Sequence, residues 1–171
     1  MTLRNLSLLF ISLFILAACG GGGGGSTTPP TAGCSPSTTN LCITVVGGKY
    51  VVQNSSSAGV SQKTLTLNAG TYTFDQTDSS NVTSGGAYGS ARIHQIGFST
   101  TDDGTFGGGS VYSTGVNTSG SPGSNGKTTI VIDASTPSTL YYYCVNHTGM
   151  GGTINIVIGN QSDQVEFTET N

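Results

Sequence analysis

The chain has 171 residues, of which five are basic and eight acidic, with two histidines, four cysteines and no tryptophan. This length fits a single domain. Charged residues make up only 8% of the chain, which excludes a protein that binds nucleic acid by neutralising phosphates, and also a long coiled coil, because both need many charged side chains. The many Val, Ile, Tyr, Thr, Ser and Gly residues instead favour a β protein with many turns.

The N-terminal segment has the pattern of an export signal. Arg4 precedes an apolar run over residues 6–16, which is too short to cross a bilayer as a helix. The run ends in the sequence LAAC, with Cys19 last, and this resembles the lipobox of bacterial lipoproteins. The resemblance implies a signal peptide over residues 1–18, cleavage before Cys19, and a lipid on its thiol. An ordinary secretion signal with an incidental cysteine is the alternative.

Low-complexity sequence follows the lipobox and closes the chain. Residues 19–33 are rich in Gly, Ser, Thr and Pro, which predicts a flexible tether between lipid and domain. The glycine after Cys19 resembles the pattern of lipoproteins sent to the outer membrane, so we expect a lipid-anchored protein of the cell envelope that faces the periplasm. Residues 159–171 predict a flexible tail, and residues 81–91 an insertion within the domain, which spans residues 34–158.

The central part of the chain alternates between short apolar runs and turn residues, without a helical period. Gly47 and Gly48 separate two of these runs as a two-residue hairpin turn. The segment 99–126 is rich in Gly, Ser and Thr, with a possible short strand at 111–112. The pattern predicts an all-β antiparallel Greek-key sandwich of seven or eight strands. The expected strands cover residues 42–46, 49–52, 63–67, 71–74, 93–99, 128–133, 140–144 and 153–158.

The cysteines divide into two groups. Cys34 and Cys42 are close in sequence and belong to an exported domain, so we expect a disulfide between them, with two free thiols as the alternative. Cys144 then has no partner. An unpaired thiol in an envelope protein calls for a functional explanation.

The rare residues of the domain suggest a copper site. Cys144, His147 and Met150 form the sequence C-x2-H-x2-M, and His94 stands fifty positions upstream. A thiolate, two imidazoles and a thioether suit copper, which alternates between soft Cu(I) and harder Cu(II). Glycines at 149, 151 and 152 allow a tight turn that brings closely spaced side chains onto one point.

At these positions the chain resembles the cupredoxins, the type 1 blue copper proteins. The short C-x2-H-x2-M loop is similar to that of amicyanin-type members. The resemblance covers roughly residues 43–158 and implies a cupredoxin-like sandwich with one copper ion. It makes His94 the N-terminal ligand, Cys144 the thiolate, His147 the C-terminal ligand and Met150 the weak axial ligand. It also implies that electrons pass through the edge of His147, within an apolar patch that docks redox partners.

The function expected from this site is electron transport rather than catalysis. No histidines remain for a second metal centre, and no serine lies in a hydrolase nucleophile motif. We therefore expect a monomeric electron carrier that meets an unidentified redox partner protein, binds the membrane through its lipid and does not bind nucleic acid. The alternatives are a metal-independent structural or binding module with the same sandwich, and a copper-binding buffer protein.

Other interpretations of these residues are weaker. Cys144 alone would be read as a buried apolar thiol. Zinc accepts two histidines and a cysteine, but a thioether is a poor zinc ligand. Asp102 and Asp103 match no established calcium loop and are expected to form a turn with Gly104.

Overall fold

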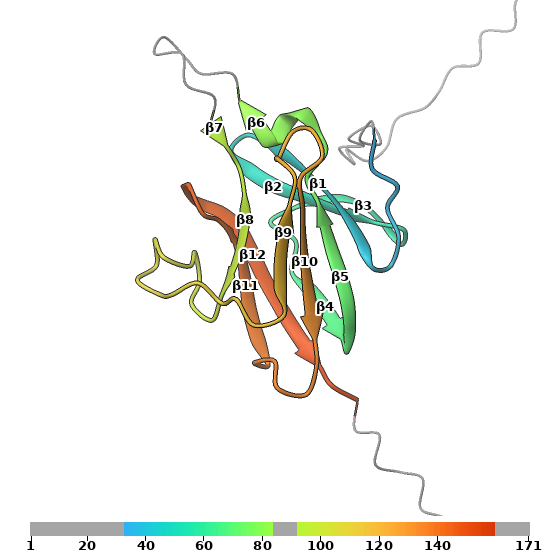
Figure 1. The fold of residues 1–171 in the computed structure, drawn as a ribbon, viewed down its shortest axis with the longest axis vertical. Helices are drawn as coiled ribbons and strands as arrows, with labels where there is room; N and C mark the ends of the chain where they lie inside the picture. The colour runs from blue at the N-terminus through green and yellow to red at the C-terminus, as the bar shows by residue number, and fades with distance from the viewer. Residues whose placement is uncertain (1–32, 84–91, 160–171) are drawn as a thin grey trace, which may run out of the picture.

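The computed structural model describes residues 33–83 and 92–159, which form two facing β-sheets and a small two-stranded sheet (Figure 1). The predicted all-β sandwich is confirmed. The predicted signal peptide, most of the tether, most of the 81–91 insertion and nearly all of the tail lie outside the described residues.

The larger sheet has six strands in the order β3-β2-β1-β5-β10-β9. The predicted hairpin at Gly47 and Gly48 is present, because Val46 pairs with Lys49 across these glycines. Both glycines have positive φ, as a two-residue turn of this kind requires. The strands are β1 (Asn40–Val46), β2 (Lys49–Asn54), β3 (Ser57–Ser61), β5 (Gly70–Asp75), β9 (Val116–Ser119) and β10 (Lys127–Ile132).

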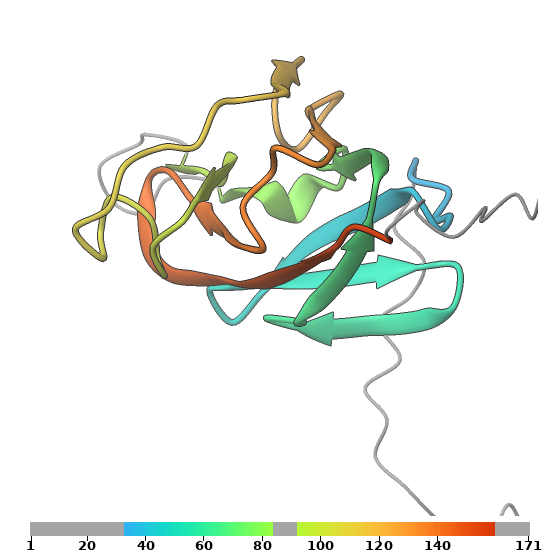
Figure 2. The same ribbon diagram turned by 90° about the horizontal axis from the view of Figure 1, so that it is seen from below.

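The smaller sheet has four strands in the order β4-β12-β11-β8. Its longest strand, β12, is strongly curved and runs along one side of the molecule (Figure 2). At one edge of this sheet, β8 pairs with β11. In the sequence, β8 follows β7, which pairs with β6 in the small two-stranded sheet, and β6 directly follows the 3-10 turn η1 (Ser79–Asn81). The bounds are β4 (Leu65–Asn68), β6 (Val82–Thr83), β7 (Arg92–Ile93), β8 (Ile96–Ser99), β11 (Thr139–Cys144) and β12 (His147–Val157).

The chain changes sheets between β4 and β5. Only Ala69 separates these strands, and a tight antiparallel hairpin needs at least a two-residue turn. The two strands therefore do not pair. Instead β4 runs parallel to β12, and β5 runs parallel to β1. The sheets are thus mixed, where the sequence predicted antiparallel pairing throughout.

The core lies between the two sheets and is formed by alternate side chains of their strands. Phe74 of β5 packs against Phe98 of β8 with ring centroids 5.1 Å apart, and against Tyr142 of β11 at 6.0 Å. Such aromatic pairs add about 0.5–1.5 kcal/mol each beyond the area that they bury. The same period of two continues past Tyr72 and Phe74 to Gln76, whose side chain is also fully buried.

Short strands raise the number to twelve within the described residues, beyond the seven or eight predicted. Strands β3 and β9 were not predicted, because they are edge strands whose sequences lack a regular apolar alternation. In the predicted strand at 111–112, Tyr112 forms an isolated bridge with Phe98.

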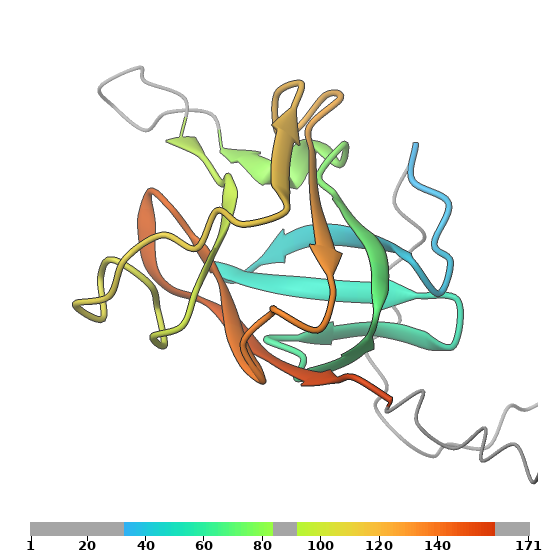
Figure 3. The same ribbon diagram turned by 60° about the horizontal axis from the view of Figure 1, so that its bottom comes forward.

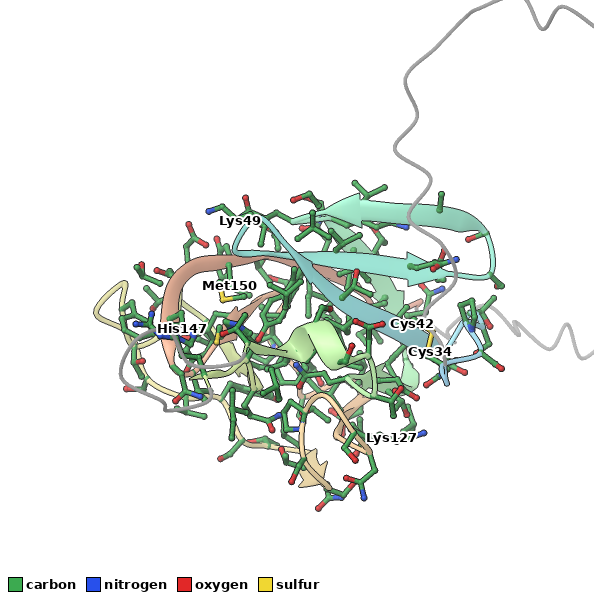
Figure 4. All side chains as sticks on the ribbon, turned by 90° about the horizontal axis from the view of Figure 1, so that it is seen from above. Cys34, Cys42, Lys49, Lys127, His147 and Met150 are labelled. Carbon is green, nitrogen blue, oxygen red and sulfur yellow. A yellow bond between two sulfur atoms is a disulfide. The ribbon has the colours of Figure 1, made fainter. Side chains whose placement is uncertain are left out.

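Cys34 and Cys42 are joined by a disulfide, the pairing that the sequence predicts, with their Cα atoms 5.8 Å apart. The disulfide lies at the opposite end of the domain from His147 and Met150 (Figure 4). It ties the segment before β1 to the edge of the core. No helix in the described part of the chain has the length and apolar character needed to cross a membrane.

Candidate metal centre

The C-x2-H spacing forms a tight hairpin. Val145 and Asn146 make the turn between β11 and β12, so Cys144 and His147 become direct partners across the strand pair. Directly paired residues in an antiparallel ladder have side chains on the same face. The Sγ of Cys144 accordingly lies 3.4 Å from the Nδ1 of His147.

A bulge after His147 brings in Met150. Strand β12 leaves its register after His147 and resumes it at Gly152, which pairs with Tyr142. Gly149 has a φ of 69°, and the main chain at Gly151 passes so close to the Tyr142 carbonyl that a Cβ would collide with it. The glycines of this loop are therefore required by its path. Met150 turns inward and is only 2% exposed.

His94 reaches the site from the other side, between β7 and β8. Ile96 pairs with Cys144 in the β8–β11 ladder, and His94 lies just before this pair. Its Nδ1 is 3.9 Å from the Sγ of Cys144, and its ring centroid is 4.6 Å from that of His147. The ligand atoms of the three residues all lie within 4.8 Å of one another.

These separations fit ligands of one metal ion. Sulfur and nitrogen atoms at about 2.3 and 2.0 Å from a shared ion, at tetrahedral to trigonal angles, are roughly 3.5–3.8 Å apart. The distances from Cys144 Sγ, 3.4 and 3.9 Å, bracket this range. His94, Cys144 and His147 therefore form a group that could hold a metal ion.

Met150 borders the same site. His94, His147 and Met150 line one pocket of about 360 Å³, together with the side chain of Arg92. In Figure 4, Met150 and His147 lie at the same end of the domain. The structure thus brings all four predicted ligands into one region, with the thioether beside the imidazoles.

Burial favours the neutral form of His94. The pKa of His94 is lowered, first by burial and then by the nearby positive charges of His147 and Arg92. A neutral imidazole is the form that binds a metal. The Nε2 of His94 is buried without a hydrogen-bond partner among the described residues. Behind the site, burial raises the pKa of Tyr50 well above its usual value, and the adjacent Cys144 adds to this effect.

Three side chains outside the predicted set hold the ligand loop. Asp103 accepts hydrogen bonds from the hydroxyl of Thr148 and from the main-chain N of Gly149, the latter at 2.8 Å. On the other side, Lys49 Nζ and Gln62 Nε2 donate to the carbonyl of Gly149. Asp103 was expected only in a turn. Its long connection from β8 to β9 extends beside the hairpin, as Figure 3 shows, and nothing in its sequence indicates this contact.

Gln95, which follows His94, does not reach the cysteine sulfur. Its side chain donates to Gln76 and Thr128, while its carbonyl accepts a hydrogen bond of 3.0 Å from the main-chain N of Val145. Gln95 thus links the two ligand segments through its backbone.

No protein-family model matches the chain, and no curated protein matches it significantly.

Proposed function

We propose that this chain is an electron carrier of the cell envelope with a single type 1 copper centre, formed by His94, Cys144, His147 and Met150. The observation that carries the proposal is the convergence of two imidazole Nδ1 atoms on the buried thiol of Cys144, at 3.4 and 3.9 Å. A soft thiolate and thioether with two imidazoles favour copper over zinc. Copper bound there would accept one electron as Cu(II) and release it as Cu(I).

The burial of the ligands supports electron transfer rather than substrate chemistry. Cys144 is fully buried and His94 nearly so, whereas His147 is half-buried and the most exposed of the three. His147 is therefore the proposed exit for the electron. Rigid ligands suit this role, because both oxidation states must share one geometry.

The surface near His147 supports docking of a redox partner. Ile93 and Val145 are 44% and 37% exposed, although both are large and apolar. The side chain of Asn146 donates to the carbonyl of Ile93 and joins the two segments. A small patch of this kind suits a weak, transient contact, and we propose a monomer that binds an as yet unidentified redox protein here.

The copper proposal is tested by a visible spectrum. Adding Cu(II) to the folded metal-free protein should give an intense thiolate-to-copper band and about one copper per chain. Cys144→Ser should abolish the band, because a hydroxyl cannot replace the thiolate donor. Cys144 is the one free cysteine of the described residues, so a thiol titration before and after loading follows the same atom.

The principal alternative is a sandwich that functions without metal. In its favour, Cys144 and Met150 already belong to the hydrophobic core cluster. A folded protein that binds no copper, or binds it without dependence on Cys144, would support this structural or binding module. Copper binding that depends on Cys144 but gives no intense thiolate-to-copper band would point to a buffer protein.

We further propose that Cys19 carries a lipid that anchors the protein in the outer membrane, on the periplasmic side. The support is the LAAC sequence after an apolar run and the low-complexity tether that follows. Cys19→Ser should move the protein from the membrane to the soluble fraction or leave its signal uncleaved. Cys144→Ser is the matched control and should stay with the membrane. Undiminished membrane association of a Cys19 variant whose signal has been cleaved would overturn the anchor.

A further inference from the structure

A fully buried side-chain amide, that of Gln76, joins the two sheets directly behind His94. Gln76 follows β5 of the six-stranded sheet, and its exposed fraction is 0%. Its Nε2 donates to the main-chain carbonyl of His94 and, at 3.0 Å, to the Oδ1 of Asn81. Its Oε1 accepts from the main-chain N of Ile96 at 3.1 Å and from Gln95 at 3.2 Å.

These four bonds use the whole capacity of the amide, which has two N–H donors and two acceptor lone pairs. Three of the four partners belong to one short segment, His94, Gln95 and Ile96. That segment lies at the edge of the four-stranded sheet, where β8 has β11 on one side only. The Gln76 amide thus bonds the His94 carbonyl and the Ile96 main-chain N, as a neighbouring strand would do at this edge.

Two further hydrogen bonds hold the main chain of His94. The hydroxyl of Tyr50 donates to the His94 carbonyl at 2.9 Å. The main-chain N of His94 donates to the carbonyl of Asn81, also at 2.9 Å. Asn81 is itself fixed, because its Nδ2 donates to the carbonyl of Ile43 at 2.8 Å. The His94 carbonyl is therefore tied to Tyr50 of β2 and to Gln76, and its N–H is tied to the 3-10 turn η1.

These hydrogen bonds hold the main chain from which the His94 ring reaches Cys144. Ile96 pairs with Cys144 and the Gln95 carbonyl accepts from the main-chain N of Val145, so the contacts with β11 and its turn extend to Gln95 but include no bond to the main chain of His94. A buried amide with all its bonds formed resists displacement, since any shift leaves a polar group unpaired in the core. We propose that Gln76, with Tyr50 and Asn81, is a positioning residue that holds His94 against Cys144, an inference that rests on the proposed metal-binding function.

The test compares Gln76→Leu and Tyr50→Phe with Ser99→Ala. Leucine keeps most of the side-chain volume and removes all four bonds, whereas phenylalanine removes only the hydroxyl. Ser99 is the matched control: it is also fully buried, lies on β8, the strand that follows His94, and donates to the carbonyl of Ser110 at 2.8 Å, away from the ligands. Co(II) is the probe, because the intensity and position of its visible bands report coordination geometry.

We expect Gln76→Leu to weaken Co(II) binding about 10- to 100-fold, as removal of groups that orient metal ligands typically does, and to shift the visible bands. Tyr50→Phe should change both in the same direction and by less. Ser99→Ala should lower the urea midpoint but keep the affinity within about twofold and the bands in place. Folded Gln76 and Tyr50 variants with wild-type affinity and bands would overturn the positioning role.

A measurement without metal keeps this inference separate from the proposed function. In the metal-free protein, the rings of His94 and His147 are close enough for nuclear Overhauser contacts, with centroids 4.6 Å apart. These contacts should weaken in Tyr50→Phe and be lost in Gln76→Leu, while Ser99→Ala keeps them. If Gln76→Leu does not fold, Tyr50→Phe decides. A wild-type protein that binds neither Co(II) nor Cu(II) would refute the proposed function, whereas unchanged ring contacts in the variants would refute the positioning role.

Discussion

Asp103 accepts a hydrogen bond of 2.8 Å from the main-chain N of Gly149, forty-six residues further along the chain. This contact joins the connection between β8 and β9 to the hairpin that carries three of the proposed ligands. Asp103 has a φ of 55°, an uncommon conformation for a residue other than glycine that Asn and Asp tolerate best. The aspartate thus fits this position both by its backbone and by its carboxylate.

Removal of this carboxylate should loosen the ligand hairpin. Asp103→Ala loses the bonds to Thr148 and Gly149 and places alanine at a φ of 55°. We expect the free energy of unfolding to fall by about 1–2 kcal/mol from both effects, given that the site is partly exposed to solvent. The Gly149 amide should exchange with deuterium faster. Asp102→Ala is the control, because Asp102 is exposed and, within residues 33–83 and 92–159, its side chain accepts only from the adjacent Asp103 N–H. Equal deuterium exchange of the Gly149 amide in both variants would contradict a role of Asp103 in holding the hairpin.

The disulfide should stabilise the domain without contributing to the site. The double variant Cys34→Ala/Cys42→Ala should lower the free energy of unfolding by about 2–3 kcal/mol, because the bond closes a short loop in the unfolded chain. Its metal affinity should match that of the wild type, since the bond lies at the far end of the domain (Figure 4). Urea denaturation and a Co(II) titration measure the two effects.

Alkylation checks the pairing itself. In denatured, unreduced and metal-free protein, Cys144 should be modified and Cys34 and Cys42 should not. Mass spectrometry that finds the latter two alkylated in exported protein would show that the bond is absent.

Met150 should tune the metal rather than hold it. Met150→Leu keeps an apolar side chain of similar volume at this buried position and should leave copper bound. Loss of an axial donor weakens Cu(II) more than Cu(I), so the reduction potential should rise, by about 59 mV for each tenfold difference. Leu65→Met, a conservative change in the core on β4, should leave the potential unchanged. An unaltered potential in Met150→Leu would make Met150 a core residue only.

The metal-free protein should lose stability in mild acid. Burial, aided by the charges of His147 and Arg92, lowers the pKa of His94 in the folded state. The unfolded chain then binds a proton from about pH 6.5 downward, before the folded state does, so acid favours unfolding. The urea midpoint should therefore fall between pH 7.5 and 5.5, and His94→Gln should reduce this fall.

A second acid-dependent group belongs to a lower pH range. Burial by itself would raise the pKa of Asp75, but hydrogen bonds from Thr77 and the ion pair with Lys127 lower it below its usual value. Stability from this carboxylate is present above its ordinary pKa, near 3.9, and is lost below it. If the urea midpoint stays constant from pH 7.5 to 5.5 and falls only near pH 4, His94 does not contribute to the loss of stability in acid.

Local sequence patterns determined the class of fold and the ligand hairpin. Alternating apolar residues with Gly-rich turns predicted the β-sandwich, and two glycines predicted the β1–β2 hairpin. The short spacing and the glycines that follow predicted that Cys144 and His147 lie together, but the turn that pairs them is at Val145 and Asn146, before those glycines. These features depend on residues a few positions apart, so sequence spacing alone expresses them.

Only the tertiary structure decided how His94 and Asp103 reach the hairpin that carries the other proposed ligands. The single residue between β4 and β5 sends the chain into the other sheet, which creates two parallel pairs that no local pattern signals. The β8–β11 pairing brings His94 beside Cys144, and Gln76 hydrogen-bonds the His94 carbonyl. Asp103 meets Gly149 across a glycine-rich connection. Period-two alternation places Gln76 on the buried face, but its partners depend on how the two sheets pack. Contacts between distant segments arise from this packing, and its geometry is not contained in residue spacing.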